Sequence, residues 1–320
     1  MGTQGQGDRA FMATGPYGMG SEPTYAGALS FMRRRYSREL AGVDVAVLGI
    51  PLDTATSNRP GARFGPAGIR AASAIMAWGK PWPWGFDPFE RLAVIDYGDC
   101  VFDYGRPEQV PDAITAQAKA ILAAGVSLLS LGGDHYVSYP LLRAHQAVHG
   151  PLALVHFDAH SDTWRDDPPP GQAPRIDHGT MFFHAAQQGL VDPAASVHVG
   201  IRTHNDETHG FTVLDAEWVY RRGAEATAAE IRRIVGRRKA YLTFDIDCLD
   251  PSCAPGTGTP VAGGLPTAQA QAILRGLGDI DFVGMDIVEV APPYDVSQIT
   301  ALAAAHLTLD YLCLRALRKG

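Results

Sequence analysis

Carboxylate and imidazole side chains gather in two short segments, each with a metal-binding type of residue at every second position. Asp158, His160 and Asp162 belong to the segment DAHSD, and Asp245 and Asp247 belong to the segment DID. Because alternate residues of an extended chain point to the same side, each segment would present its polar side chains together. The alternative for each segment is a solvated, Asp-rich turn that binds nothing. We interpret both segments as candidate metal-binding sites.

A third candidate histidine follows two glycines, which allow the chain to turn sharply. His135 closes the segment GGDH, directly after an apolar run that ends at Leu131. A single histidine at such a place is more often a structural residue held by hydrogen bonds. Its neighbour Asp134 could orient a metal ligand. All three segments follow predicted strands, and sites in open parallel sheets form beyond the carboxyl ends of strands.

Four carboxylates gathered around two histidines would repel one another unless cations neutralised them. Two like charges ~4 Å apart repel by about 4 kcal/mol at an effective dielectric constant of about 20. Two divalent ions would balance the charge, and oxygen and imidazole ligands without thiolate favour Mn²⁺ over structural zinc. Ions bridged by carboxylates could share one water and lower its pKa, which gives a hydroxide near neutral pH.

The elements that must position these residues are short apolar runs separated by helical stretches. Nearly continuous apolar runs are typical of strands buried on both faces of a parallel sheet. Their alternation with helices predicts an α/β fold, a three-layer α/β/α sandwich around a mostly parallel sheet. One helix is predicted to begin at a capping box of Thr227 and Glu230. The predicted strands are 45–50, 92–95, 126–131, 152–157, 197–201, 240–244 and 282–288, and the predicted helices are 111–124, 228–238, 267–277 and 298–318.

Composition narrows the function classes. The formal net charge is −7 and no basic run occurs, which argues against nucleic acid and anionic membrane surfaces as partners. No window approaches the ~20 apolar residues of a membrane span. The four cysteines form no C-x-x-C pair and no secretory signal is present, so we expect a cytoplasmic protein with reduced thiols. We expect residues 1–20 to form a flexible arm and 21–320 to form a single catalytic domain.

These segments resemble the signatures of the ureohydrolase family, which contains arginases and agmatinases. The resemblance lies in GGDH, DAHSD and FDIDCLDP, and extends to RFGP, HGTMF, GTGTPV and EVAP. It implies an arginase-like three-layer fold and assembly into homotrimers or hexamers. It also implies two Mn²⁺ ions per subunit, with Asp158 and Asp245 as bridges. One ion would be held by His135, Asp158, Asp162 and Asp245, and the other by Asp158, His160, Asp245 and Asp247.

Two further residues acquire roles through the resemblance. His178 is the candidate for transferring a proton to the leaving amine, although a loop histidine without chemistry is its plain alternative. Glu289 follows the strand 282–288 and could pair with guanidinium N–H groups, although it could also be an ordinary strand-end glutamate. Asp286 falls on the other face of a regular strand, so no role is assigned to it.

The expected reaction is hydrolysis of a small cationic guanidinium compound by a metal-bridging hydroxide. HGTMF and GFTVLDA are similar to bacterial agmatinases, which implies cleavage of agmatine to putrescine and urea. The loop 164–177 leaves a guanidino acid open as substrate, since Arg165 or Arg175 could bind a carboxylate. Asp166 or Asp167 could instead attract an ammonium group, or the loop could do neither. More distant alternatives are a zinc deacetylase-like enzyme and an inactive metal-binding protein.

Overall fold

One parallel sheet runs through the computed structural model, which describes residues 25–76, 79–166 and 168–319. Its eight strands lie in the order β2-β1-β3-β8-β7-β4-β5-β6, and all neighbours pair in parallel. The arm predicted before residue 20 lies outside the described residues. The strands are β1 (Val45–Ile50), β2 (Val94–Asp99), β3 (Ser127–Gly132), β4 (Ala153–Phe157), β5 (Val197–Val199), β6 (Thr212–Leu214), β7 (Lys239–Asp245) and β8 (Asp281–Val288).

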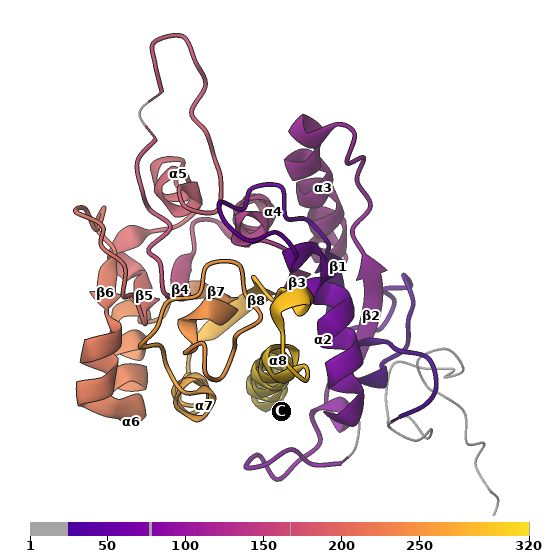
Figure 1. The fold of residues 1–320 in the computed structure, drawn as a ribbon. Coiled ribbons are helices and arrows are strands. Elements are labelled where there is room, and N and C mark those ends of the chain that lie inside the picture. The colour runs from indigo at the N-terminus through magenta and orange to yellow at the C-terminus, as the bar shows by residue number, and fades with distance from the viewer. Residues whose placement is uncertain (1–24, 77–78, 167, 320) are drawn as a thin grey trace, which may run out of the picture.

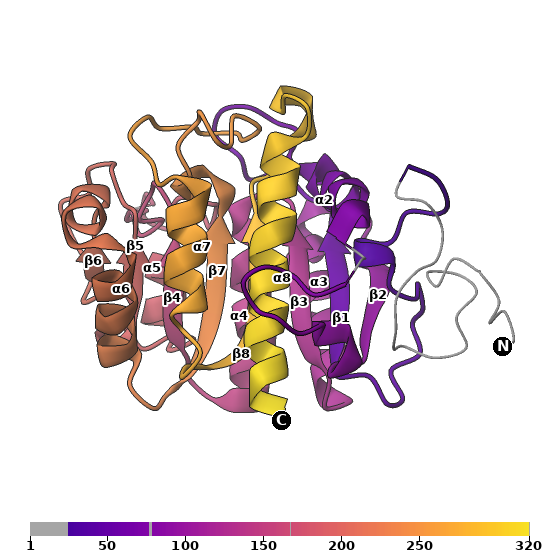
Figure 2. The same cartoon turned by 90° about the horizontal axis from the view of Figure 1, so that it is seen from below.

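Helices cover both faces of this sheet, which confirms the predicted three-layer α/β/α sandwich. Helices α3, α4 and α5 pack on one face, while α2, α6, α7 and α8 pack on the other (Figures 1 and 2). None of the described helices is long and apolar enough to span a membrane. The helices are α2 (Gly65–Ser73), α3 (Val110–Ala123), α4 (Ser138–His149), α5 (Met181–Gln187), α6 (Ala216–Val235), α7 (Thr267–Arg275) and α8 (Ile299–Lys319).

The continuous apolar runs arise because each strand contributes to two cores. In β1 every residue is buried. Val47 belongs to the core under α2, α7 and α8, whereas its neighbours Ala46 and Leu48 belong to the core under α3 and α4. Successive side chains of a strand point to opposite faces of the sheet. Because both faces are covered here, every position of β1 is apolar and the usual alternation of apolar and polar residues is absent.

The capping box predicted at Thr227 and Glu230 is wrong. Helix α6 begins at Ala216, where Asp215 accepts a hydrogen bond from the backbone N–H of Trp218. Thr227 lies inside the helix and donates its hydroxyl to the carbonyl of Gly223, 2.7 Å away. Gly223 has a φ of 78° and interrupts the helix there. A serine or threonine inside a helix commonly donates its hydroxyl to a carbonyl of the preceding turn. A threonine three residues before a glutamate therefore does not by itself mark the start of a helix.

Strand β8 is last along the chain but lies in the middle of the sheet, between β3 and β7. The strands β3, β8, β7 and β4 therefore stand side by side, and their carboxyl ends meet at one edge. Each of the predicted polar segments leaves one of these four strands. The topology thus brings residues that are up to 154 positions apart in the chain to one place.

Candidate metal centre and substrate pocket

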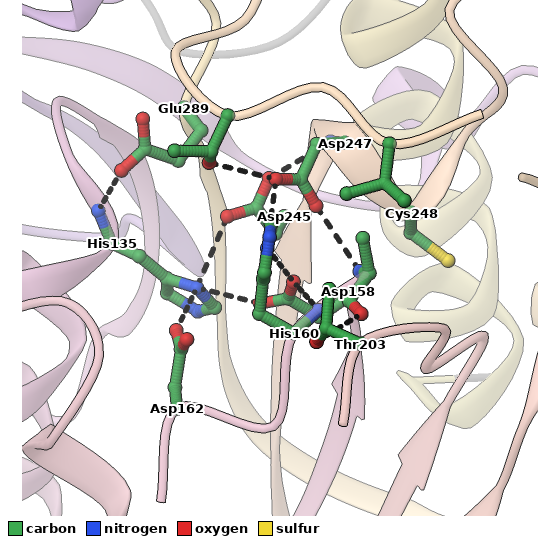
Figure 3. Close-up of polar contacts among 12 residues, drawn as sticks. His135, Asp158, His160, Asp162, Thr203, Asp245, Asp247, Cys248 and Glu289 are labelled. Atoms are coloured by element: carbon green, nitrogen blue, oxygen red, sulfur yellow. Dashed lines mark hydrogen bonds and ion pairs between the residues drawn. The ribbon is translucent and has the colours of Figure 1, made fainter. Parts of the chain in front are cut away.

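The predicted ligand residues meet at the carboxyl ends of β3, β4 and β7 (Figure 3). His135 is on the short helix after β3, Asp158 directly follows β4, and Asp245 ends β7. The side chains of all six predicted ligands except His160 are at least nine-tenths buried. The six are His135, Asp158, His160, Asp162, Asp245 and Asp247.

Three carboxylates surround one nitrogen of His135. Its Nδ1 atom lies 3.0 Å from Asp158 Oδ2, 3.0 Å from Asp162 Oδ2 and 3.2 Å from Asp245 Oδ2 (Figure 3). Asp162 adopts a left-handed backbone with a φ of 53°, which costs energy for a non-glycine residue. The backbone is thus held in an unfavourable conformation where this carboxylate joins the group.

A second group forms on the other side of Asp158. His160 Nδ1 lies 3.3 Å from Asp158 Oδ1 and 3.2 Å from Asp247 Oδ2. Asp158 therefore directs one carboxylate oxygen to each group, as a bridging ligand would. Asp245 directs Oδ2 to the His135 group, whereas its Oδ1 accepts the backbone N–H of Asp247 at 2.8 Å.

The hydrogen bonds of His135 show that a cation fits this place. Its Nε2 lies 2.8 Å from Thr243 Oγ1, and the Thr243 hydroxyl donates to Asp286 at 2.5 Å. The Thr243 hydroxyl donates its hydrogen to Asp286, so it can only accept from His135. We therefore assign the ring hydrogen of His135 to Nε2, which leaves an unshared electron pair on Nδ1. Nδ1 is buried, has no hydrogen-bond partner, and faces three carboxylate oxygens. A divalent cation would remove that repulsion.

The pKa values within the cluster show the same conflict of charges. Burial, followed by the charges of Asp247 and Asp158, raises the pKa of the Asp245 carboxyl well above its usual range. Burial and the charge of Asp158 also raise the pKa of Asp247. Partial burial lowers the pKa of His160, but Asp158 and Asp247 outweigh this effect and raise the pKa to about 12. Carboxylates packed this closely either bind protons or are neutralised by positive charge among them.

His178 and Glu289 lie beside this cluster. His178 Nδ1 lies 3.6 Å from Glu289 Oε1, and its Nε2 lies 2.8 Å from Ser57 Oγ. Burial lowers the pKa of His178, but the hydrogen bond to Glu289 and nearby carboxylates raise it overall to about 9. Glu289 Oε1 accepts the backbone N–H of His135 at 2.8 Å, while its buried Oε2 has no hydrogen-bond partner. This oxygen is free to accept N–H groups from a ligand.

A cavity of about 320 Å³ opens onto the cluster. His160, Asp162 and Asp245 lie on its wall together with His178. Most of the lining residues belong to the β4–α5 connection, part of which projects from the body of the molecule (Figure 1). A larger cavity of about 500 Å³ lies nearby, but none of the predicted ligands lines it. The smaller cavity is therefore the candidate substrate pocket.

The structure separates the candidate residues of the loop 164–177. Arg175 lines the substrate pocket, where its Nε lies 2.9 Å from Asp177 Oδ2. Arg165 instead lies over the ring of Phe183 and 3.6 Å from Glu207. Asp166 accepts the backbone N–H of Arg175 and is not among the pocket residues, and residue 167 lies outside the described residues. Of the described candidate residues in this loop, Arg175 is the one that lines the pocket. Its guanidinium pairs with the carboxylate of Asp177, which the sequence analysis did not single out.

The sequence analysis missed three polar residues beneath the cluster. His156 extends the alternating series of Asp158 and His160 by one step, so its spacing could have identified it. Thr243 carries no signal of its own. Asp286 was left without a role, but it is buried and accepts hydrogen bonds from the hydroxyl groups of Ser138, Tyr241 and Thr243.

Asp134 holds two backbone segments beside the cluster. Its carboxylate accepts the backbone N–H of Tyr136 at 3.0 Å and that of Ala55 at 3.0 Å. It therefore caps the short helix that carries His135 and fastens the loop that contains Ser57. Burial, followed by the charge of Glu289, raises the pKa of Asp134 to about 7.

Comparisons with known proteins agree with this geometry. The model of the arginase family matches residues 43–313. A protein of Chromobacterium violaceum described as agmatinase is 60% identical over 309 residues, covering 96% of this chain and 95% of that protein. A crystal structure of a hypothetical agmatinase from Burkholderia thailandensis superposes with a TM-score of 0.94 at 59% identity, covering 98% of each chain. Proclavaminate amidino hydrolase from Streptomyces clavuligerus has a TM-score of 0.86 at 40% identity, covering 92% of this chain and 99% of that one. Since its family model spans most of the sequence, the chain belongs to the arginase family.

Proposed function

We propose that this protein is a manganese-dependent ureohydrolase that converts agmatine to putrescine and urea. One observation carries the proposal. Two carboxylate–imidazole groups share Asp158 at the base of a cavity, beside a carboxylate oxygen of Glu289 that has no partner. The description of relatives at 52–60% identity as agmatinase supports agmatine as the substrate.

The residues present fit a pair of divalent cations. His135, Asp158, Asp162 and Asp245 would hold one ion, and Asp158, His160, Asp245 and Asp247 would hold the other. Two groups of possible ligand atoms lie within 4.8 Å of one another. One is His135 and His156 with Asp158 and Asp162, and the other is Asp158 with His160 and Asp247. When bound, the ions would supply Lewis acidity and lower the pKa of water enough to make it a nucleophile near neutral pH. Oxygen-rich ligands without thiolate support Mn²⁺.

Glu289 and His178 act on the substrate in this proposal. Glu289 Oε2 accepts N–H groups of the guanidinium, which holds its carbon beside the carboxylate cluster. The imidazole of His178 lines the same cavity and passes a proton to the amine that leaves. Glu289 has a left-handed backbone with a φ of 62°, and its N–H donates to the carbonyl of Gly133 at 2.9 Å. The Glu289 carboxylate thus lies beside His178, which lines the pocket.

Steady-state assays with Mn²⁺ on agmatine, 4-guanidinobutyrate, 3-guanidinopropionate and arginine test this assignment. We expect the highest kcat/KM with agmatine and loss of urea release after exhaustive chelation, with recovery when Mn²⁺ is added back. A guanidino acid with a higher kcat/KM would reject agmatine. Full activity after chelation would reject the metal centre, and one zinc per chain without urea release would point to a deacetylase-like enzyme.

A guanidino acid is the second candidate substrate, because Arg175 lies on the pocket wall. Replacing Arg175 with glutamine distinguishes a substrate whose far end, or tail, is a carboxylate from one whose tail is an ammonium group. A carboxylate tail would lose a charge-assisted hydrogen bond, and kcat/KM for guanidino acids should fall about tenfold, which corresponds to roughly 1.4 kcal/mol. An ammonium tail gains nothing from this cation, so kcat/KM for agmatine should change by less than about threefold. Arg165→Gln is the matched control, and a tenfold loss with agmatine would contradict the proposal.

The finer properties stay predictions. We propose a homotrimer or hexamer, to be checked by light scattering, and a single catalytic domain over 21–320 located in the cytoplasm. A small cationic guanidinium compound is the proposed partner. The negative net charge and the absence of a basic run support the view that nucleic acid is not a partner.

A further inference from the structure

A row of buried polar side chains crosses the middle of the sheet beneath the candidate metal centre. Asp286 on β8 pairs in register with Thr243 on β7, Thr243 pairs with His156 on β4, and His156 pairs with His198 on β5. All four residues are at most 1% exposed. Residues paired in register in a parallel sheet point to the same face. Burying polar groups is costly unless they are hydrogen-bonded, so this row calls for a reason.

The two histidines of this row are linked by hydrogen bonds to Asp158. His156 Nε2 lies 2.7 Å from Asp158 Oδ2, and His156 Nδ1 lies 2.5 Å from His198 Nδ1. The carboxylate can only accept, so His156 donates from Nε2, and the tautomer that does so accepts at Nδ1. His198 Nδ1 must then carry a hydrogen and donate it to His156. The two rings therefore form a directed chain of hydrogen bonds that leads to a carboxylate oxygen.

The ring of His156 is held on several sides. Its centroid lies 5.1 Å from that of His135, 4.7 Å from that of Phe182 and 4.8 Å from that of His198. Phe211 packs against the far ring, 4.5 Å from His198. Such packing restricts rotation of the His156 ring and so favours an Nε2–H directed at Asp158.

The position of Asp158 matters for both groups of the candidate centre. Its Oδ2 lies 3.0 Å from His135 Nδ1, and its Oδ1 lies 3.3 Å from His160 Nδ1. Rotation of this carboxylate would move an oxygen away from each group. A fixed donor on Oδ2 prevents that rotation, which is the role that outer hydrogen-bond partners of metal ligands commonly have.

We propose that His156 and His198 are positioning residues, a two-histidine chain that fixes the Asp158 carboxylate for binding of both cations. This inference rests on the metal centre of the proposed function. His198 lines the larger cavity, separate from the substrate pocket, and its Nε2 has no hydrogen-bond partner among the described residues. Substitutions at either histidine therefore change the support of Asp158 without altering the walls of the substrate pocket.

Paired variants of His156 test the first link. His156→Gln keeps an N–H donor near the position of Nε2, whereas His156→Met fills similar space without a donor. Affinity for Mn²⁺, measured by competition with a chelating dye, should fall roughly 10- to 100-fold in His156→Met and stay within about threefold of wild type in His156→Gln. Equal affinities in the two variants would overturn the proposal. Loss in both would show that His156 is itself a ligand, since an amide nitrogen cannot replace imidazole on a metal.

Variants of His198 test the second link. His198→Asn keeps a donor near the position of Nδ1, whereas His198→Leu leaves His156 Nδ1 buried without one. Mn²⁺ affinity should fall about tenfold in His198→Leu and recover in His198→Asn. Wild-type affinity in His198→Leu would show that the chain ends at His156 and would overturn the two-histidine proposal. For all four variants, kcat should follow metal occupancy while KM stays close to that of wild type.

The wild-type protein separates failure of this inference from failure of the proposed function. If wild type binds no Mn²⁺ or releases no urea, the proposed function is wrong. If wild type does both and all four variants bind Mn²⁺ as it does, the positioning role alone is wrong. Melting curves of the metal-free proteins identify any variant whose fold has failed, and the Gln and Asn variants then carry the comparison with wild type.

Discussion

Asp245→Asn should lower kcat for urea release by at least about 10³-fold, which is roughly 4 kcal/mol of transition-state stabilisation. Asp245 Oδ2 lies 3.2 Å from His135 Nδ1, and the proposed function makes this residue a bridge between two cations. Outer hydrogen-bond partners of ligands already contribute 10- to 100-fold to metal affinity or activity, so loss of a bridging carboxylate should cost more. Metal analysis of the purified variant should show less than two Mn²⁺ per chain.

The same substitution should have the opposite effect on the metal-free protein. Burial and the charges of Asp247 and Asp158 raise the pKa of Asp245, so its charge destabilises the metal-free fold at neutral pH. Asparagine removes that charge, and the Tm of metal-free Asp245→Asn should exceed that of metal-free wild type. The increase in Tm on adding Mn²⁺ should be smaller than in wild type. Asp206→Asn, in a side chain that is 92% exposed, is the matched control. Retained Mn²⁺ binding and turnover in Asp245→Asn would contradict the bridging role.

His178→Asn should lower kcat by about 10²- to 10⁴-fold, the range that a positioned acid or base contributes. His178 lines the substrate pocket, and its Nδ1 lies 3.6 Å from Glu289 Oε1. It is not among the proposed ligands, so Mn²⁺ content should remain two per chain and Tm should be close to that of wild type. The variant thus separates proton transfer from metal binding.

His204→Asn provides the control for this loss of an imidazole. His204 is 88% exposed and pairs with Asp206 at 2.9 Å, away from the substrate pocket. Its kcat should equal that of wild type. A kcat for His178→Asn within about threefold of wild type would remove His178 from the mechanism, because such a loss is below any acid–base contribution.

The sequence predicted much of the sheet because burial on both faces leaves a clear signal. The strand 45–50 was predicted with its observed bounds. The strand 152–157 differs from the structure by one residue at one end, and those at 126–131 and 240–244 differ by one residue at each end. Strand β6, Thr212–Leu214, was not predicted, since three residues at the edge of a sheet carry too little apolar pattern. Helix α6 begins at Ala216, twelve residues before the predicted start, and Gly223 interrupts it between its true cap, Asp215, and the predicted one.

The candidate cluster could be predicted from the alternation of Asp158 with His160 and of Asp245 with Asp247. The contacts of the residues around the cluster could not be predicted in this way. Contact between His156 and His198 depends on the register of β4 and β5, and residue spacing in a single chain does not specify register. The direction of Arg165 away from the pocket depends likewise on where Phe183 lies after the chain has turned into α5.

The central place of β8 has a consequence for a chain emerging from the ribosome. Without β8, the strands β2, β1 and β3 have no hydrogen-bonded neighbour in common with β7, β4, β5 and β6. His135 belongs to the first set, while the carboxylates around it belong to the second. Until residues 281–288 have been translated and inserted, the nascent protein remains two half-sheets, each with open edges. The proposed cation site is therefore expected to form only after β8 has been inserted, and loss of residues 281–320 would leave each half without its partner.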